Sequence, residues 1–305
     1  MAKEQSADTI AMQIRKGKLP PAKPADAGGS HAAVGTVRAG RFDRLDALRG
    51  FALVWMACFH FSFDLSNWHL LAANFYADPF WTTQRTCILS TFLLCAGAGQ
   101  AVATAQGQSW PRFWRRWAQI AGCALLVSVG SWFMFPHSYI YFGVLHGMAV
   151  MLIVARLSAR WGAALWPLGL LAVLAPVWVQ SPWFDSRWTS WVGLVTHKPI
   201  TEDYVPLLPW LGVMWWGLAA TQWMQHHCPH WLGGRPATGQ GHAPADGASG
   251  DNGGQSGGGF AALMRGRVAL AWLGRHSLTF YMVHQPVLIG ALWCWMTATG
   301  RPIPA

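Results

Sequence analysis

Seven long apolar runs dominate this sequence, and each holds about 20 residues, enough for one helix across a bilayer. Such runs form helices because lipid offers no water to satisfy exposed backbone N–H and C=O groups. The sequence therefore predicts an all-α, polytopic membrane protein with a bundle of about seven transmembrane helices. The predicted spans are residues 48–69, 83–104, 117–135, 139–157, 161–179, 207–225 and 276–297.

The composition supports a membrane protein rather than a nucleic-acid-binding one. Hydrophobic residues make up 53% of the chain and charged residues 11%, against roughly 25% charged in an ordinary soluble domain. The net charge of +10 comes from Lys and Arg in short clusters between the apolar runs, which suits a lipid bilayer better than a nucleic acid. The six cysteines show no CxxC spacing, so free thiols and no metal site are expected.

Two low-complexity segments divide the chain. Residues 1–40 hold Lys, Ala, Pro and Gly without an apolar run and are predicted to be a disordered basic arm. Residues 41–225 contain the first six predicted helices. Residues 226–268 are rich in Gly and Ser and are predicted to be a cytoplasmic linker, before a seventh helix and tail in residues 269–305. The first apolar run already has spanning length, so it is predicted to stay as an anchor rather than be cleaved as a signal peptide.

The distribution of basic residues predicts the orientation in the membrane. Alternate loops are rich in arginine, whereas the opposite loops hold few basic residues, and the positive-inside rule then makes the amino terminus cytoplasmic. The basic residues of the predicted inner side are Arg41, Arg44, Arg49, Arg112, Arg115, Arg116, Arg156, Arg160, Arg235, Arg265, Arg267 and Arg275.

The first predicted helix carries two ionisable residues, His60 and Asp64, one turn apart on the same face. Such a pair inside hydrocarbon is costly unless it faces a partner or water, so it indicates a function. We expect the carboxylate to orient the imidazole as a general base. His146 should reach a similar depth from the opposite direction, although a lone intramembrane histidine is more often an interhelical hydrogen-bonding residue.

The last predicted helix contributes His284 near mid-depth, two residues before Pro286. Proline there removes a backbone hydrogen bond and leaves a carbonyl free to face a cavity. His69 lies at the outer end of the first helix, where the physical interpretation is structural. The inner side is rich in guanidinium groups that suit phosphate, orientation and anionic lipid equally well. These candidate phosphate ligands are Arg44, Arg49, Arg112, Arg115, Arg116 and Arg275.

Four segments in order resemble bacterial membrane proteins related to heparan-alpha-glucosaminide N-acetyltransferase, within the wider transmembrane acyltransferase group. They are "RLDALRGFALVWMACFHFSFDL" (44–65), "YIYFGVLHGMAV" (139–150), "YVPLLPWLGVMWWG" (204–217) and "LGRHSLTFYMVHQPVL" (273–288). The resemblance implies an acyltransferase of the bacterial inner membrane. It would move an acetyl group from cytoplasmic acetyl-CoA, as co-substrate, to a hydroxyl or amine of a sugar or glycan on the far side.

The resemblance also implies roles for individual residues. Arg49 lies in the family's "D-x-x-RG" segment, His60 and Asp64 match its histidine–aspartate position, and His146, Arg275 and His284 match the later segments. The lysosomal enzyme looks to carry asparagine where His60 stands and an active histidine after helix one, for which His69 is an approximate counterpart. Which histidine does the chemistry stays open, as do direct transfer against an acyl-histidine intermediate, the acyl chain length and a homodimer.

A proton-coupled transporter is the alternative interpretation, because intramembrane His and Asp also form proton relays. No inverted repeat is evident among the seven runs, which argues against common transporter layouts. A haem-binding electron carrier would need paired histidines on facing helices, and the chain does not supply the two stacked pairs of a transmembrane cytochrome.

Overall fold

The computed structural model describes residues 43–228 and 257–301. Apart from an isolated bridge between Phe142 and Tyr204, the regular structure of these residues is helical, which confirms the all-α prediction. The predicted basic arm, most of the predicted linker, and Arg41 and Arg235 lie outside the described residues. The described helices belong to one unit of the chain by their contacts.

Each of the seven predicted apolar runs overlaps a helix. In order they correspond to α2 (Asp43–Asn67), α3 (Pro79–Ala105), α4 (Trp110–Met134), α5 (Val144–Ser158), α6 (Leu165–Trp178), α7 (Leu207–His227) and α10 (Ser277–Ala298). Local signals set several boundaries. Asp78 caps α3 by accepting a hydrogen bond from the Phe80 backbone N–H at 2.8 Å, Pro79 occupies its first turn, and Gly107 follows its end with a positive φ.

Two helices, α3 and α4, are long and apolar enough to cross a membrane by length and composition. α5 and α6 have 15 and 14 residues, so they extend about 22 Å against a hydrocarbon thickness of about 30 Å. Large apolar side chains of α4 point outward, with Leu125 65% and Phe133 80% exposed, as suits contact with lipid. Seven complete spans and a cytoplasmic amino terminus remain predictions.

Helix α7 packs against α3 on one side and α6 on the other through glycines. A Cβ atom on Gly97 would collide with the Met214 carbonyl oxygen, and one on Gly217 with that of Leu94. Gly212 of α7 approaches the backbone of Gly169 in α6 in the same way. These small residues let the backbones come close, which is how helices associate where lipid removes the hydrophobic drive. The core formed around α7 includes Leu93, Met151, Leu165, Met214 and Leu218, all fully buried.

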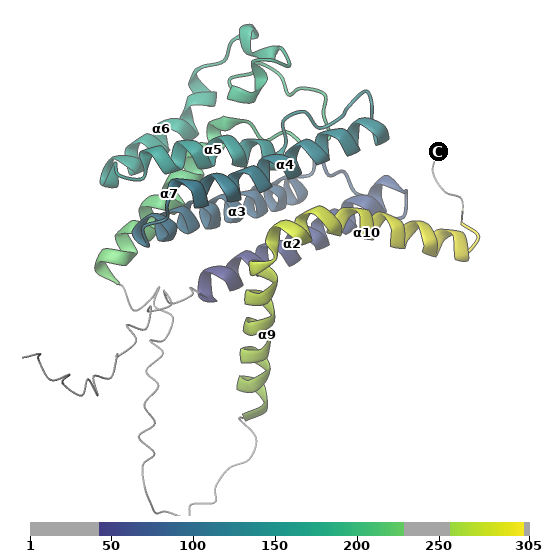
Figure 1. Cartoon of the computed structure of the whole chain (residues 1–305). Coiled ribbons are helices and arrows are strands. Elements are labelled where there is room, and N and C mark those ends of the chain that lie inside the picture. The colour runs from purple at the N-terminus through teal and green to yellow at the C-terminus, as the bar shows by residue number, and fades with distance from the viewer. Residues whose placement is uncertain (1–42, 229–256, 302–305) are drawn as a thin grey trace, which may run out of the picture. The chain divides into compact units, whose positions relative to one another are not determined.

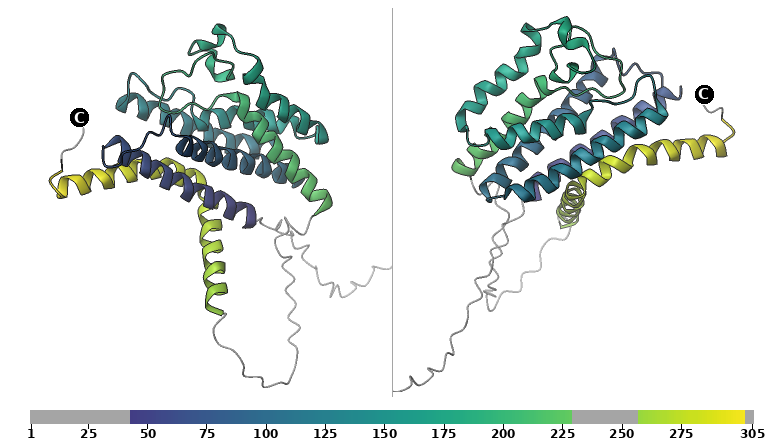
Figure 2. Two further views of the ribbon diagram at one scale, coloured as in Figure 1. Left: turned by 180° about the vertical axis from the view of Figure 1, so that it is seen from behind. Right: turned by 45° about the horizontal axis from the view of Figure 1, so that its top comes forward.

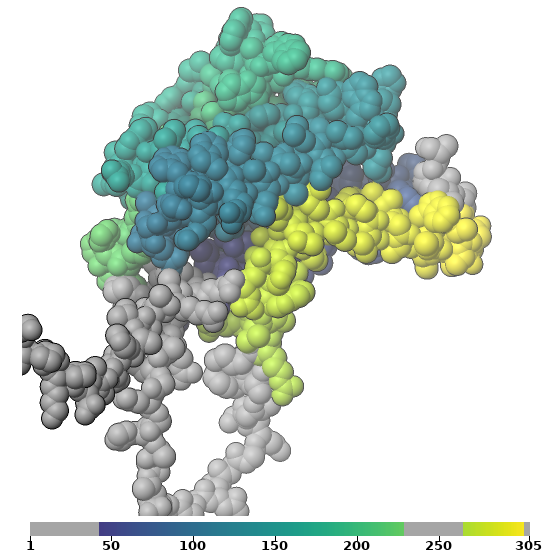
Figure 3. Space-filling model, viewed as in Figure 1, coloured from purple at the N-terminus to yellow at the C-terminus, as the bar shows by residue number. Residues whose placement is uncertain are grey.

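Helix α2 packs between α3 and a helix pair at the end of the chain, α9 (Gly257–Arg275) and α10. Helices α2 and α9 cross closely at Gly50 and Gly274. A Cβ on Gly50 would overlap the backbone of Leu270, and a Cβ on Gly274 would overlap that of Asp46. α9 meets α10 at a sharp bend at His276, and the two helices run in different directions (Figures 1 and 2). In Figure 3, α2 is visible only in the gap between α4 and the α9–α10 pair. α9 begins inside the segment predicted to be a linker.

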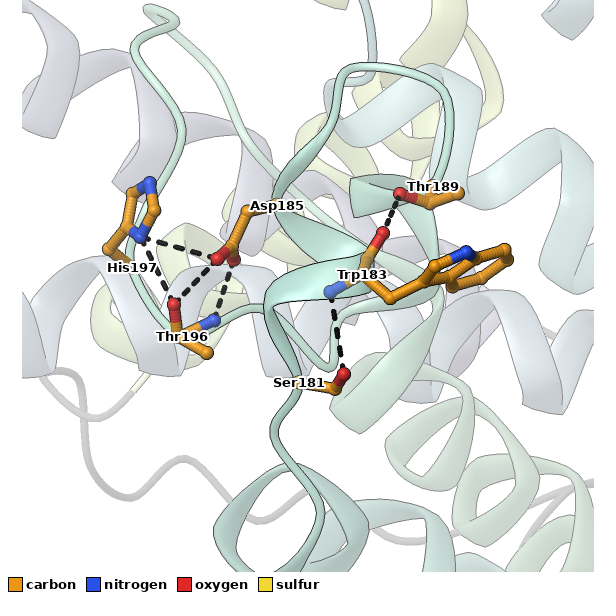
Figure 4. Close-up of polar contacts among 6 residues, drawn as sticks. All are labelled: Ser181, Trp183, Asp185, Thr189, Thr196 and His197. Atoms are coloured by element: carbon orange, nitrogen blue, oxygen red, sulfur yellow. Dashed lines mark hydrogen bonds and ion pairs between the residues drawn. The ribbon is translucent and has the colours of Figure 1, made fainter.

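The long segment between α6 and α7 contains two short 3₁₀ turns, η2 (Pro182–Asp185) and η3 (Ser190–Val192). Asp185 closes this segment on itself: it accepts hydrogen bonds from the Thr196 backbone N–H at 2.8 Å and hydroxyl at 2.6 Å, and lies 3.5 Å from His197 Nδ1. Figure 4 shows Thr196 and His197 on one side of Asp185 and the Trp183 ring on the other. The bonds from Thr196 hold the pKa of the Asp185 carboxyl below its ordinary value of 3.8, despite some desolvation, so the carboxylate is ionised at neutral pH.

We expect Asp185→Ala to loosen this segment and to speed trypsin cleavage after Arg187, because the Thr196 N–H and hydroxyl then both lose the carboxylate that accepts their hydrogen bonds. Asp185→Asn keeps an oxygen for the Thr196 N–H and should be cleaved more slowly than the alanine variant. Because the pKa of Asp185 is lowered, its hydrogen bonds stabilise the segment fully above the ordinary carboxyl pKa, and this stabilisation is lost as the pH falls through the lowered pKa. The variants should therefore be compared at neutral pH. Equal cleavage of wild type and Asp185→Ala would contradict the assignment.

Candidate active site

Two histidines from opposite ends of the chain meet where α10 crosses α2. The ring centroids of His60 and His284 are 5.2 Å apart and the rings are tilted by 60°. His284 is buried, with 8% of its surface exposed, and the Phe280 ring stacks on it. His60 is half-buried beside Phe59. The structure thus brings together two of the histidines that the sequence singled out.

The hydrogen bond of His284 defines its tautomer. Its Nδ1 lies 2.7 Å from the Tyr281 carbonyl oxygen, and because a carbonyl can only accept, Nδ1 must carry the proton. In the neutral ring, Nε2 is then left with a free lone pair. That atom is buried and has no hydrogen-bond partner among the described residues. A ring held through Nδ1–H, with Nε2 available, has the geometry of a general base.

The Asp64 carboxylate hydrogen-bonds a residue of α10 and not the His60 imidazole on its own helix. Its Oδ1 accepts a hydrogen bond from Gln285 Nε2 at 2.8 Å, and its Oδ2 has no partner within the described ranges. The sequence predicted that Asp64 orients His60; the hydrogen bond of the carboxylate goes instead to the residue after His284. Gln285 was not predicted as a site residue, because sequence spacing relates residues within a helix and not across two helices.

His146 has both ring nitrogens engaged. The Gly143 backbone N–H donates to its Nδ1 at 3.3 Å, so Nε2 carries the proton and donates to Ser128 Oγ at 3.1 Å. Ser128 in turn donates to the Ile140 carbonyl oxygen at 2.7 Å. This chain ties α5 to α4 and leaves the neutral ring without a free lone pair. The arrangement matches the interhelical interpretation of His146 rather than a catalytic one.

The amino terminus of α5, next to His146, is capped from a distant loop. Asp203 Oδ2 accepts a hydrogen bond from the Val144 backbone N–H at 2.7 Å. Burial raises the pKa of Asp203, an effect that this hydrogen bond partly opposes.

His69 lies in the turn after α2, is exposed and has a positive φ of 58°. Neither His69 nor Asp203 is in the contact between α2 and α10.

An arginine-lined cavity of about 680 Å³ lies between α2, α3, α4, α5, the end of α9, and α10. That volume is within the range of small-molecule sites. Arg49 is held at the cavity by Asp46, 3.3 Å away, and by the Cys95 carbonyl oxygen at 3.4 Å. Arg44 is exposed and is not one of the lining residues. The arginines that line the cavity are Arg49, Arg112, Arg115, Arg116 and Arg275.

Beside the arginines, helices α2, α5 and α10 contribute apolar and aromatic side chains to the cavity wall. One face of α5, with Val144, Met148 and Leu152, lines it over two turns, and Leu53 and Tyr281 form part of its wall. His60 and His284 are not lining residues themselves, but His284 lies one turn beyond Tyr281, whose carbonyl it contacts. Four glutamines also line the cavity and were not predicted from the sequence: Gln100, Gln106, Gln108 and Gln119.

The described residues contain no group of three or more His, Cys, Asp or Glu arranged to hold a metal ion. Their cysteines are free, with Cys95 buried in the helix contact beside Arg49.

Comparison with known families gives a match over the first part of the chain. The family model described as "Heparan-alpha-glucosaminide N-acetyltransferase, catalytic" matches residues 41–243. The comparisons with curated proteins and with solved structures gave no match.

Proposed function

Because the chain belongs to the heparan-alpha-glucosaminide N-acetyltransferase catalytic family, a family of membrane acetyltransferases, we propose that it moves an acetyl group from cytoplasmic acetyl-CoA to a sugar on the opposite side of the membrane. The observation that carries this proposal is the cavity, which is lined by five arginines and by Tyr281, one turn from His284. Donor and acetyl-accepting group would meet at the imidazoles of His60 and His284.

The arginine end of the cavity suits the phosphates of acetyl-CoA. Arg112, Arg115 and Arg116 lie three and four residues apart on α4 and so share one face, while Arg49 and Arg275 reach the cavity from α2 and α9. Guanidinium forks bind phosphate oxygens in pairs and remain charged at any physiological pH. The apolar face of α5 suits the pantetheine arm, which would carry the thioester toward Tyr281.

The free Nε2 of His284 supports a direct transfer. It would take the proton from the attacking hydroxyl or amine as that group adds to the thioester carbonyl. The tetrahedral intermediate then expels CoA by breaking the C–S bond, and the proton on His284 returns to the thiolate. His60 is close enough to hydrogen-bond the oxyanion through a ring N–H. The hydrogen bond of Nδ1 favours His284 over His60 as the base.

The proposed orientation follows the arginine-rich loops. The cavity arginines would face the cytoplasm, where CoA is found, with the amino terminus on the same side and the segment containing η2 and η3 outside. The bacterial inner membrane is the membrane that we propose. All seven apolar helices would contribute to the bundle, the shorter ones with the help of neighbouring loops and interfacial tryptophans.

The experiment that tests this function uses the full chain reconstituted in liposomes with its arginine-rich side outward. Acetyl-CoA radiolabelled in the acetyl group is added outside and a panel of amino sugars and glycans is trapped inside. The expected result is label covalently attached to a trapped sugar, with unlabelled CoA released outside. A proton-coupled transporter would instead move a solute without acetylating it, and that outcome would reject the acyltransferase.

The donor site leads to a separate prediction. Arg49→Gln and Arg275→Gln should each raise the Kd for acetyl-CoA by about 10-fold, the value of one charge-assisted phosphate contact. Arg160→Gln is the matched control, because this exposed arginine is predicted to lie on the same membrane side but does not line the cavity. Calorimetry or equilibrium binding of labelled acetyl-CoA measures all three, and unchanged affinity in both cavity variants would place the donor elsewhere.

A further inference from the structure

Gln285 joins the last helix of the described chain to the buried carboxylate of the first. Its Nε2 donates to Asp64 Oδ1 at 2.8 Å, across 221 positions of sequence. Asp64 is 5% exposed, and a carboxylate in an apolar interior is tolerated where hydrogen-bond donors compensate its lost hydration. Gln285 supplies such a donor from α10.

The position of this bond relates it to the histidine pair. Asp64 follows His60 by four residues, one turn along α2, and Gln285 follows His284 directly on α10. A hydrogen bond between Asp64 and Gln285 therefore fixes how α10 is rotated against α2 within one turn of the two rings. That rotation decides where His284 Nε2 points.

Helix α10 lacks one backbone hydrogen bond next to Gln285. Pro286 lies inside the helix directly after Gln285. Proline has no N–H to donate to the carbonyl four residues earlier, that of Met282, and its ring crowds that carbonyl. The helical hydrogen bonds therefore do not fix the local direction of α10 by themselves, and a side-chain contact at position 285 has a larger effect than it would in a regular helix.

The orientation of the Gln285 amide follows from the chemistry of its partner. The Nε2 end of the amide faces Asp64, where it can donate to a carboxylate oxygen that accepts. Gln285 Oε1 is then left buried and without a partner among the described residues, as are Asp64 Oδ2 and His284 Nε2. An amide kept in this position at the cost of an unsatisfied oxygen indicates that the contact with Asp64 matters more than the satisfaction of Gln285 itself.

We propose that Gln285 is a positioning residue of the acyl-transfer site: through its hydrogen bond to Asp64 it holds His284 in register with His60. This inference rests on the proposed function, in which His284 accepts the proton of the attacking group. Gln285 acts through Asp64 and does not touch the reacting atoms.

The first test is a double-mutant cycle on the full chain. Gln285→Leu and Asp64→Leu should each lower kcat for acetyl transfer by about 10- to 100-fold, as expected for a misplaced catalytic group, while the Kd for acetyl-CoA stays at the wild-type value. The double variant should be no slower than the slower single variant, because both remove the same contact. Asp64→Asn keeps an oxygen for Gln285 Nε2 and should lose less activity than Asp64→Leu.

Gln222→Leu is the matched control, since Gln222 Nε2 makes a hydrogen bond of the same kind to the Ala159 carbonyl oxygen, away from the histidine pair. Its kcat should remain at the wild-type value. If Gln285→Leu does not give a monodisperse protein that binds acetyl-CoA, Gln285→Met, closer in shape to glutamine, takes its place. Additive losses in the double variant, or a kcat for Gln285→Leu equal to that of Gln222→Leu, would overturn the proposal.

A second measurement does not require turnover. Diethyl pyrocarbonate modifies a free imidazole nitrogen. Mass spectrometry of the digested protein then measures the rate at which His284 is modified. Gln285→Leu and Asp64→Leu should change that rate by about threefold or more, the effect expected for one interhelical hydrogen bond in a membrane protein, and Gln222→Leu should not. If the wild-type protein acetylates nothing and the labelling still responds in this way, the proposed function fails and the positioning role stands; labelling that responds to neither variant rejects the positioning role.

Discussion

Replacing His284 by alanine is expected to lower kcat for acetyl transfer by about 10²- to 10⁴-fold, the usual contribution of a general base. The reason is the free lone pair on Nε2, which the hydrogen bond from Nδ1 to the Tyr281 carbonyl leaves available. Binding of acetyl-CoA should persist, because His284 does not line the arginine cavity proposed to hold the donor. Initial rates with saturating radiolabelled acetyl-CoA, together with equilibrium binding of the donor, measure both effects.

The matched controls for this prediction are other histidines of the chain. His60→Ala should also reduce kcat, but less than His284→Ala if His60 stabilises the oxyanion and His284 takes the proton. His227→Ala should have no effect, since this exposed ring stacks on Trp223 at the end of α7. A fully active His284→Ala protein beside an inactive His60→Ala protein would transfer the role of base to His60.

A large effect on stability is expected from a single methyl group at Gly217. Gly217→Ala should lower the free energy of unfolding by about 1–3 kcal/mol, the cost of overpacking a close contact. The added Cβ would overlap the Leu94 backbone, which cannot turn aside as a flexible side chain can, so α3 and α7 must separate. The midpoint of thermal unfolding in detergent, with donor binding as a check on the native state, gives the measurement.

Gly122→Ala provides the contrast within the same protein. Gly122 also lies inside a long helix, but an added Cβ there meets nothing within 4 Å. Alanine is favoured over glycine in a helix by roughly 0.5–1 kcal/mol, so this variant should unfold at or above the wild-type temperature. If both variants shifted the midpoint in the same direction by the same amount, the close approach of α3 and α7 would not be a determinant of stability.

The helices could be predicted from the sequence because a run of about 20 apolar residues in lipid has few alternatives to a helix. Which helices pack against each other could not be predicted from the sequence. Helices that are apolar on most faces give no clear indication of which side meets which neighbour, so the sequence related His60 to His146 by depth. The structure instead brings His284 of α10 to His60, while His146 contacts Ser128 and Gly143.

The cavity lining includes predicted phosphate-binding arginines where helix geometry places them on one face, and phosphate binding itself stays a prediction. Arg112, Arg115 and Arg116 share a face of α4 by their spacing, and all of them line the cavity. Arg44 and Arg49 are five residues apart on α2, which puts them on different sides of the helix, and Arg44 is outside the lining. Helix α9 was missed because its glycine-rich start is typical of a linker, whereas its packing on α2 depends on tertiary contacts at Gly50 and Gly274.

The packing of α9 and α10 on α2 has a consequence for how the protein can be shortened. The family match ends at residue 243, and a fragment cut to that length would keep α2 to α7. It would discard Arg275, His284 and Gln285, and it would uncover the side of α2 against which Leu270 rests. A chain trimmed in this way would lack the residues that we propose for acyl transfer, and one apolar side of α2 would be exposed.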